Sequence, residues 1–278
     1  MADNLIKVAE IVVKKLQSTG APLASPTADD VILINYGQDI SLEDVITDGE
    51  RIEQLGPEGV VCALQADDEF TGATVTGNLA KYPKKLKYLL MGGTYVAATD
   101  TWTPPMAGTI NVAPVEAKFY CEKYNDVENT ETDLVGYEVL VLPKAKGRLG
   151  ALSVSNTAFT SGPFTFNAKD YVAVDPAESK PCYYFDTEAA ALPSAGSYAQ
   201  PFHVIESAGE TDLAGVLISV TVNGAPVTGT TDASGEASLT LPYGVHTYTA
   251  SKDTYTSLTG SITVGLVNDT KELEMALA

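Results

Sequence analysis

The sequence predicts a mainly β protein with two domains, the first of them a sandwich or barrel that carries one short packed α-helix. Three observations lead to this fold class. Short runs of alternating polar and apolar residues recur between residues 30 and 175, one run with helical spacing interrupts them, and the alternation becomes cleaner after about residue 205. A chain of 278 residues is long enough for two domains. We place them at residues 1–205 and 210–278.

The strands of the first domain are recognised by their period of two. Within "VEAKFYCEKY", Val115, Ala117, Phe119 and Cys121 alternate with polar residues, as expected of a strand with one buried and one solvated face. Further runs of this kind are "VILINYG", "GVVCALQ", "ATVTGNL", "YEVLVLP", "ALSVS" and "PFTFNA", and an edge strand is expected within residues 175–201. Many short strands of this kind predict a sandwich or barrel.

One helix is expected directly after residue 83. Pro83 suits a first helical turn, Leu86, Leu89 and Leu90 share a face, and two consecutive glycines end the helix at residue 92. The N-terminal run "NLIKVAEIVVKKL" also has apolar residues at helical spacing, but it is rich in β-branched residues. Helix and strand both stay open there, as does an arm that becomes ordered only against a neighbouring molecule.

Residues 210–278 alternate most regularly. Asn223 and Gly224 form a hairpin turn, and the chemistry of a second turn accounts for Thr231, Asp232, Ser234 and Gly235. About seven strands in roughly 70 residues predict a small immunoglobulin-like sandwich. Its inward positions are Val216, Ile218, Val220, Val222, Ala237, Leu239, Leu241, Tyr248, Ala250, Ile262, Val264, Leu273, Met275 and Leu277.

The net charge of the chain argues against a protein that binds nucleic acid. Thirty-six acidic and seventeen basic residues give a net charge of -19, of which residues 210–278 carry -6 and the first 209 residues carry -13. Such a surface repels phosphates. No apolar run is long enough for a signal peptide or a membrane span, so we expect a soluble chain that is made in a cytoplasm and does not insert into membranes.

Residues suited to catalysis or metal binding are few. The chain has two histidines, His203 and His246, which argues against histidine-based catalysis and against a multi-histidine metal site. The cysteines Cys62, Cys121 and Cys182 form no CxxC pair and are expected to be buried thiols, not a disulfide frame or a zinc site. We therefore expect no catalytic residues, no cofactor and no metal.

Acidic clusters leave two alternatives open. General acid–base chemistry by a carboxylate pair competes with a solvated loop or strand end, and the pairs concerned are Asp29 with Asp30 and the run Asp67, Asp68 and Glu69. The stretch "YNDVENTETD", residues 124–133, offers oxygen ligands for calcium but lacks the spacing of an EF-hand loop. A mobile acidic loop is the preferred interpretation.

A single basic cluster accompanies the expected helix. It consists of Lys81, Lys84, Lys85 and Lys87. Four lysines on an amphipathic helix usually form its solvated face. In a chain this acidic, they are also suited to an electrostatic contact with the acidic surface of another copy.

Two stretches resemble tail tube (major tail) proteins of long-tailed bacteriophages. They are "GYEVLVLPKAKGRLGALSVSNTAFTSGPFTFNA", residues 136–168, and "GVVCALQADDEFTGATVTGNLAKYPKKLKYLLMGG", residues 59–93. The resemblance covers the pattern of residues 30–175 and rests on structural motifs. It implies homo-hexameric rings that stack into a tube, joined by loops and an N-terminal arm. It also implies tape measure and tail terminator proteins as partners, assembly in the host cytoplasm, and location in the virion tail.

The C-terminal stretch beginning "VTVNGAPVTGTTDASGEASLTLPYG" is similar to bacterial immunoglobulin-like and carboxypeptidase-regulatory-like modules. Such modules are appended to the outside of some tail tubes and also occur on adhesins and glycan enzymes. The resemblance implies an accessory domain that projects outward, binds the host surface weakly and favours a non-contractile tail. Deletion of residues 210–278 is expected to leave tube formation intact.

An acidic or neutral wall suits a conduit that must eject DNA, because a basic wall would hold the duplex. Glu116, Glu122 and Glu138 are the candidates for this lumen, with the outer face as the open alternative for each. The overall expectation is a structural virion protein without enzyme activity. The alternatives are a surface adhesin or carbohydrate-binding β protein with an immunoglobulin-like module, and a hydrolase that uses Asp67 and Asp68.

Overall fold

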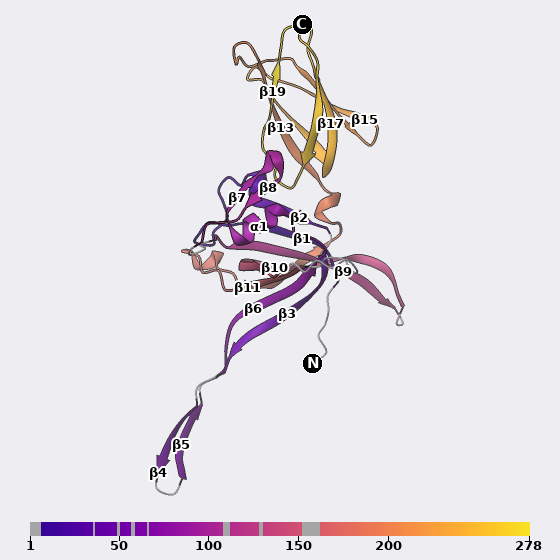
Figure 1. Cartoon of the computed structure of the whole chain (residues 1–278). Helices are drawn as coiled ribbons and strands as arrows, with labels where there is room; N and C mark the ends of the chain where they lie inside the picture. Colours follow the sequence, from indigo (N-terminus) through magenta and orange to yellow (C-terminus); the bar gives the residue numbers. More distant parts are fainter. Residues whose placement is uncertain are drawn as a thin grey trace. The chain divides into compact units, whose positions relative to one another are not determined.

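The computed structural model describes residues 7–35, 37–48, 51–56, 59–65, 67–107, 112–127, 130–151 and 162–278. The chain divides into two compact units. The larger unit comprises residues 1–23 and 34–188, and the C-terminal unit comprises residues 24–33 and 189–278. Strands dominate both units, as predicted, and the described residues contain one α-helix (Figure 1).

Seven of the eight strands in the largest sheet lie in the larger unit and organise it (Figure 1). The order of this sheet is β2-β1-β9-β10-β11-β6-β3, and β12 pairs with β10 outside this path. Two short antiparallel pairs, β4-β5 and β7-β8, complete the strands. The bounds are β1 Val8–Lys15, β2 Val31–Ile34, β3 Gly37–Thr47, β4 Arg51–Gly56, β5 Gly59–Gln65, β6 Glu69–Leu79, β7 Thr94–Val96, β8 Thr101–Thr103, β9 Val115–Val127, β10 Thr130–Leu149, β11 Gly162–Ala168 and β12 Tyr184–Ala189.

The core of the larger unit follows from the register of three neighbouring strands. Ile11 of β1 and Leu140 of β10 both lie opposite Phe119 of β9, and all three side chains are fully buried. Phe119 also packs against Phe164 and Phe166 of β11, with ring centroids 6.4 and 5.9 Å away. Side chains opposite each other in an antiparallel pair share a face, so this alternation fixes which face is buried.

Helix α1 spans Lys84–Met91 and covers part of this core. Leu86, Leu89 and Leu90 are buried, as predicted from their spacing. The helix approaches β10 closely, since a Cβ built on Gly147 would lie 2.5 Å from the Leu90 side chain. Gly92 ends the helix with φ of 73°, a conformation that favours glycine.

The C-terminal unit contains one mixed and one antiparallel sheet, which share a hydrophobic core. One has the order β16-β13-β19 and the other β15-β14-β17-β18. Predicted inward residues such as Val216, Ile218, Leu241 and Val264 are fully buried in this core. The bounds are β13 Ser197–Glu206, β14 Leu217–Val222, β15 Ala225–Thr230, β16 Glu236–Pro242, β17 Gly244–Ser251, β18 Leu258–Val264 and β19 Lys271–Met275.

The structure corrects two details of the sequence interpretation and resolves one alternative that the sequence left open. Strand β13, expected before the domain boundary, belongs to the C-terminal unit, so the boundary lies at residues 188–189 instead of 205–210. Leu277, expected to face inward, is 60% exposed because β19 ends at Met275. The N-terminal run forms strand β1, which pairs with β9 of its own chain. The predicted strand "ALSVS" lies almost wholly outside the described residues.

Candidate assembly surfaces

A two-stranded ribbon leaves the main sheet where β11 ends. Pairing between β11 and β6 stops at the Ala168–Ala73 pair, whereas β6 continues to pair with β3 as far as Glu69. We call residues 43–48 and 67–72 the ribbon. Its neighbouring pair Ile46 and Phe70 is 58% and 48% exposed. A two-stranded hairpin is marginally stable by itself, so this ribbon exposes apolar surface that a further contact would cover.

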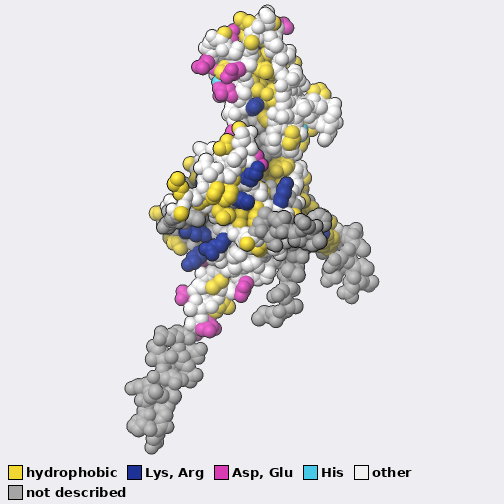
Figure 2. Space-filling view, viewed as in Figure 1, with side chains coloured by type: hydrophobic (Ala, Val, Ile, Leu, Met, Phe, Trp, Pro, Cys, Tyr) yellow, Lys and Arg dark blue, Asp and Glu magenta, His cyan; other side chains and the backbone are white. Residues whose placement is uncertain are grey.

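The ribbon is also strongly acidic. Its residues include no lysine or arginine, and its acidic residues are Glu43, Asp44, Asp48, Asp67, Asp68 and Glu69. All six side chains are exposed. Figure 2 shows Asp and Glu side chains gathered on this part of β3 and β6. Within the predicted carboxylate run, Asp67 and Asp68 precede β6 and Glu69 begins it.

Aromatic side chains continue this surface beyond the ribbon. Phe70 packs edge-to-face with Tyr183, and Tyr183 packs likewise with Phe185, each pair with ring centroids 6.4 Å apart. Phe185 is 47% exposed. Burial and the neighbouring Asp44 carboxylate both raise the pKa of Tyr183 above its ordinary value, so its hydroxyl is protonated at neutral pH.

A groove lies where strands β9 and β10 separate. Register between them ends at the Val115–Ala145 pair, and the chain before β9 turns toward β1, where the N–H of Leu16 donates to the carbonyl of Pro114. The space that opens has a volume of about 890 Å³. We call it the groove; its lining comprises Ser18, residues 89–91, 112–114 and 144–149, Asn167 and Lys169.

The groove combines an apolar base with a basic rim. Leu89 and Leu90 at the end of α1 are buried beneath it, and the basic side chains that line it are Lys144, Lys146, Arg148 and Lys169. The described residues that line it include no acidic side chain. Among the described residues, no carboxylate forms an ion pair with any of these four side chains. Lys and Arg side chains gather on the body of the larger unit in Figure 2.

The predicted basic cluster around α1 has contacts within its own chain. The Lys84 ammonium lies 3.3 Å from the Asp100 carboxylate, and Lys87 lies 5.3 Å from the ring centroid of Trp102. Lys81 and Lys85 also have partners. These contacts anchor the helix to the β7-β8 hairpin, so the cluster is less suited to another copy than the groove, and its role between subunits remains a prediction.

The three glutamates predicted for a lumen do not share one face. Glu116 and Glu122 lie on one face of β9, whereas Glu138 of β10 lies opposite Cys121 and so points to the other face. The Lys7 ammonium lies 2.6 Å from Glu122, and Lys14 lies 3.9 Å from Glu116.

Two side chains contact the Glu122 carboxylate. The Lys7 ammonium and the Tyr124 hydroxyl both contact the Glu122 carboxylate, and together they hold its pKa below the ordinary value. Both neighbours favour the charged form of the carboxylate. The assignment of these glutamates to a lumen remains a prediction.

The described cysteines are free, buried thiols, as predicted for Cys121 and Cys182. Burial, followed by the charge of Glu138, raises the pKa of the Cys121 thiol to about 12. A thiol with such a pKa is unreactive at neutral pH. The side chain of Cys62 lies outside the described residues.

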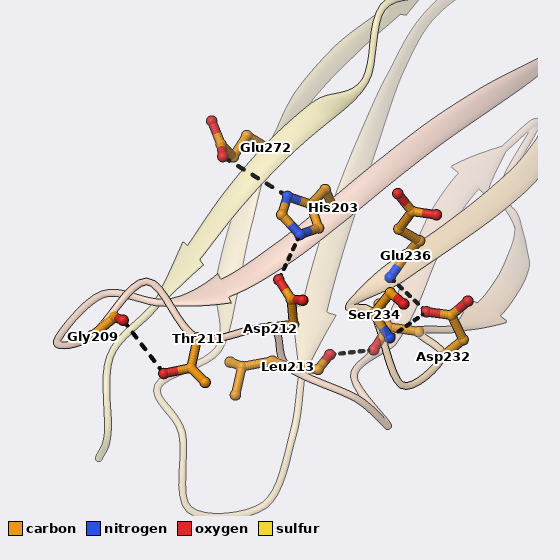
Figure 3. Close-up of polar contacts among 10 residues, drawn as sticks. His203, Gly209, Thr211, Asp212, Leu213, Asp232, Ser234, Glu236 and Glu272 are labelled. Atoms are coloured by element: carbon orange, nitrogen blue, oxygen red, sulfur yellow. Dashed lines mark hydrogen bonds and ion pairs between the residues drawn. The ribbon is translucent and has the colours of Figure 1, made fainter.

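A polar network in the C-terminal unit surrounds His203 (Figure 3). Its Nε2 lies 2.9 Å from Asp212 Oδ1, and its Nδ1 lies 3.8 Å from Glu272 Oε1. His246 lies in another part of the unit, where its Nε2 is 2.8 Å from the carbonyl oxygen of Pro242. The Asp212 carboxylate lies within hydrogen-bond distance of His203, whereas the Glu272 carboxylate lies beyond it, so the group is a surface contact of β13.

The turn before β16 is built as its sequence predicts (Figure 3). Asp232 Oδ1 accepts hydrogen bonds from the N–H groups of Ser234 and Glu236, at 2.9 and 3.0 Å. Gly235 adopts φ of 70°, and a Cβ there would lie 2.5 Å from the carbonyl oxygen of Val204. These contacts account for the turn residues without a ligand.

The described side chains include no group of three or more histidine, cysteine, aspartate or glutamate residues that could hold a metal ion. Asp30 instead accepts hydrogen bonds from the N–H and hydroxyl of Thr27, which caps a short 3₁₀ turn. The side chains of residues 125–133 in the predicted acidic loop lie outside the described set. No described helix is long and apolar enough to cross a membrane.

Sequence reasoning missed both the ribbon and the groove. The ribbon's β3 segment, "SLEDVIT", shows no clean alternation of polar and apolar residues. Its acidic residues, with no basic residue among them, were nevertheless a visible signal of an acidic surface. The groove unites segments that are distant in sequence, and only the alternating basic positions in "KAKGR" could have indicated it.

Comparisons with known proteins leave the family open. No protein-family model and no curated protein matches the chain. Solved structures that are similar include the Bacillus anthracis TIE protein, at 9% identity and a TM-score of 0.29, with 98% of this chain and 35% of that chain covered. The chain thus spans about a third of that protein's length.

Two pilins give similarly weak matches. The shaft pilin spaA from Lactobacillus rhamnosus GG has 8% identity and a TM-score of 0.27, with 98% and 85% of the two chains covered. A Streptococcal ancillary pilin has 12% identity and a TM-score of 0.26, with 97% and 92% covered. Similarity at this level carries no argument about what the chain does.

Proposed function

We propose that this chain is a structural subunit that self-associates through its larger unit, as hexameric rings stacked into the tail tube of a long-tailed bacteriophage. The observation that carries the proposal is the ribbon, which holds Ile46 and Phe70 exposed on a two-stranded extension of the sheet. Apolar residues on an exposed strand edge invite pairing with another chain. Repeated pairing between copies produces closed rings or open filaments.

The distribution of exposed apolar residues supports assignment of assembly to the larger unit. Most of the large apolar side chains that are exposed among the described residues belong to it, including Val172, Val174 and Phe185. The C-terminal unit exposes Leu217, Val245 and Leu277. We assign this unit the role of an outward accessory module that binds the host surface weakly.

The charge of the chain suits a tube through which DNA passes. A net charge of -19 gives a wall that repels phosphates, so DNA would move without lasting contacts. Tape measure and tail terminator proteins would be its partners in the virion tail. In this role the chain has no catalytic step and needs no cofactor.

Negative-stain electron microscopy of the purified full chain tests the proposal. At increasing protein concentration we expect rings of about sixfold symmetry or hollow tubes. Single particles of monomer size at every concentration and salt condition would contradict it. Solid fibres without a channel would support self-association but contradict the tube.

A second candidate function is a surface adhesin or carbohydrate-binding β protein with an immunoglobulin-like module. The separate core of the C-terminal unit favours it. Glycan-array binding by a monomeric chain would support this candidate over the first.

A further inference from the structure

Among the described residues, the segment of β10 that lines the groove has a strand register along one edge only. From Lys146 to Leu149, β10 pairs with β11 on one side, whereas its register with β9 has already ended at Ala145. Residues 112–114 form the far wall of the groove instead of continuing the ladder. An extended segment that enters such a gap can hydrogen-bond the strand edge and extend the sheet.

The groove specifies the chemistry of the segment that would enter it. Its rim carries the basic side chains of Lys144, Lys146, Arg148 and Lys169, and Leu89 and Leu90 lie at its base. In a chain with 36 acidic and 17 basic residues, a groove whose described lining has four basic side chains and no acidic one is unusual. It therefore suits an extended segment with both acidic and apolar side chains.

The ribbon has this composition and also a free strand edge. Strand β3 is the last strand in the sheet order, so one of its edges has no neighbour within the described sheet. Exposed Glu43 and Asp48 accompany the apolar Val45 and Ile46 along it. Acidic and apolar residues of the ribbon thus match basic and apolar residues of the groove.

We propose that the ribbon of one copy occupies the groove of a second copy, with β3 adding to the open edge of β10. This inference rests on the proposed self-association and names the two surfaces that carry it. Because the ribbon and the groove are different surfaces, the contact is heterologous, and its repetition gives a ring or a filament. Charge complementarity would select this pairing over pairing between two acidic ribbons.

Charge reversal on the full chain tests the pairing. The groove variant is Lys146→Glu with Arg148→Glu, and the ribbon variant is Glu43→Lys with Asp48→Lys. A matched control, Lys252→Glu with Lys271→Glu, reverses two charges in the C-terminal unit, which contributes no residue to either surface. Sedimentation velocity measures the concentration at which half of the protein is assembled, and thermal unfolding checks that each variant folds.

We expect each single-surface variant to raise the half-assembly concentration at least about tenfold, which corresponds to about 1.4 kcal/mol. The control should remain within about twofold of the unchanged chain. A chain with all four reversals in both surfaces should assemble again. An equimolar mixture of the two single-surface variants should also assemble, because each supplies the surface that complements the other.

The outcomes separate this inference from the function on which it rests. An unchanged chain that stays monomeric contradicts both. An unchanged chain that assembles, together with folded groove and ribbon variants that assemble equally well, overturns only the ribbon–groove pairing. Failure of both the four-reversal chain and the mixture to assemble likewise overturns the pairing.

Discussion

Replacement of Thr231 by valine should destabilise the C-terminal unit far more than a strand substitution normally does. Thr231 is 4% exposed and joins two parts of the sandwich. Its hydroxyl donates to the carbonyl of Leu213 at 2.6 Å and accepts from the N–H of Val216 at 2.9 Å. Valine has nearly the same shape but can make neither bond.

The magnitude follows from the two backbone groups that would lose their partner. A buried polar group left unsatisfied costs about 1–3 kcal/mol, so loss of both partners is expected to lower the free energy of unfolding by about 2–6 kcal/mol. For a unit of about 100 residues, 1 kcal/mol corresponds to roughly 4–8 °C in Tm. The Tm of the C-terminal unit should therefore fall by at least about 8 °C.

Calorimetry and circular dichroism on the full chain measure this effect. Trp102, the single tryptophan, lies in the larger unit, so its fluorescence reports separately on that unit. The matched control is Thr230→Val, since Thr230 is the exposed neighbour at the end of β15. A Thr231→Val chain that is as stable as the Thr230→Val chain would refute the reasoning, and Thr231→Ser should retain most of the stability.

Three further predictions concern the larger unit. Phe119→Ala should lower its free energy of unfolding by about 3–5 kcal/mol in urea titrations followed by Trp102 fluorescence, because a fully buried ring is removed; a loss below about 1 kcal/mol would contradict the packing. The lowered pKa of Glu122 stabilises the fold above the unfolded pKa, and this contribution disappears as pH falls through the folded pKa. Glu122→Gln should therefore flatten the pH dependence of unfolding below about pH 5, and an unchanged profile would refute this. In a chain whose other cysteines are serine, Cys121 should react with a thiol reagent at pH 8 only at the rate of unfolding, because its pKa is raised to about 12; rapid labelling of the folded chain would contradict its burial.

Elements with strong local signals were predictable from the sequence. The position of α1 follows from Pro83, three leucines on one face and the terminal glycines. The turn at Asn223 and Gly224 is another such element, since both residues adopt positive φ, at 49° and 82°. In each case neighbouring residues alone determine the conformation.

Features that depend on distant contacts were less predictable. Pro201 argues against a central strand, yet β13 tolerates it because pairing with β19 begins only at Phe202. The domain boundary was therefore placed too late. The N-terminal run is a strand because it pairs with β9. The groove is lined by five segments that are far apart in the sequence.

The central claim is that the larger unit drives self-association through its ribbon, and sedimentation velocity across a wide concentration range tests it most directly. The comparison is between the unchanged chain, Ile46→Ser with Phe70→Ser in the ribbon, and Leu217→Ser with Val245→Ser as exposed apolar controls in the C-terminal unit. We predict large assemblies of the unchanged and control chains at high concentration, with the ribbon variant remaining monomeric. A single monomeric species for the unchanged chain at every concentration would contradict the account.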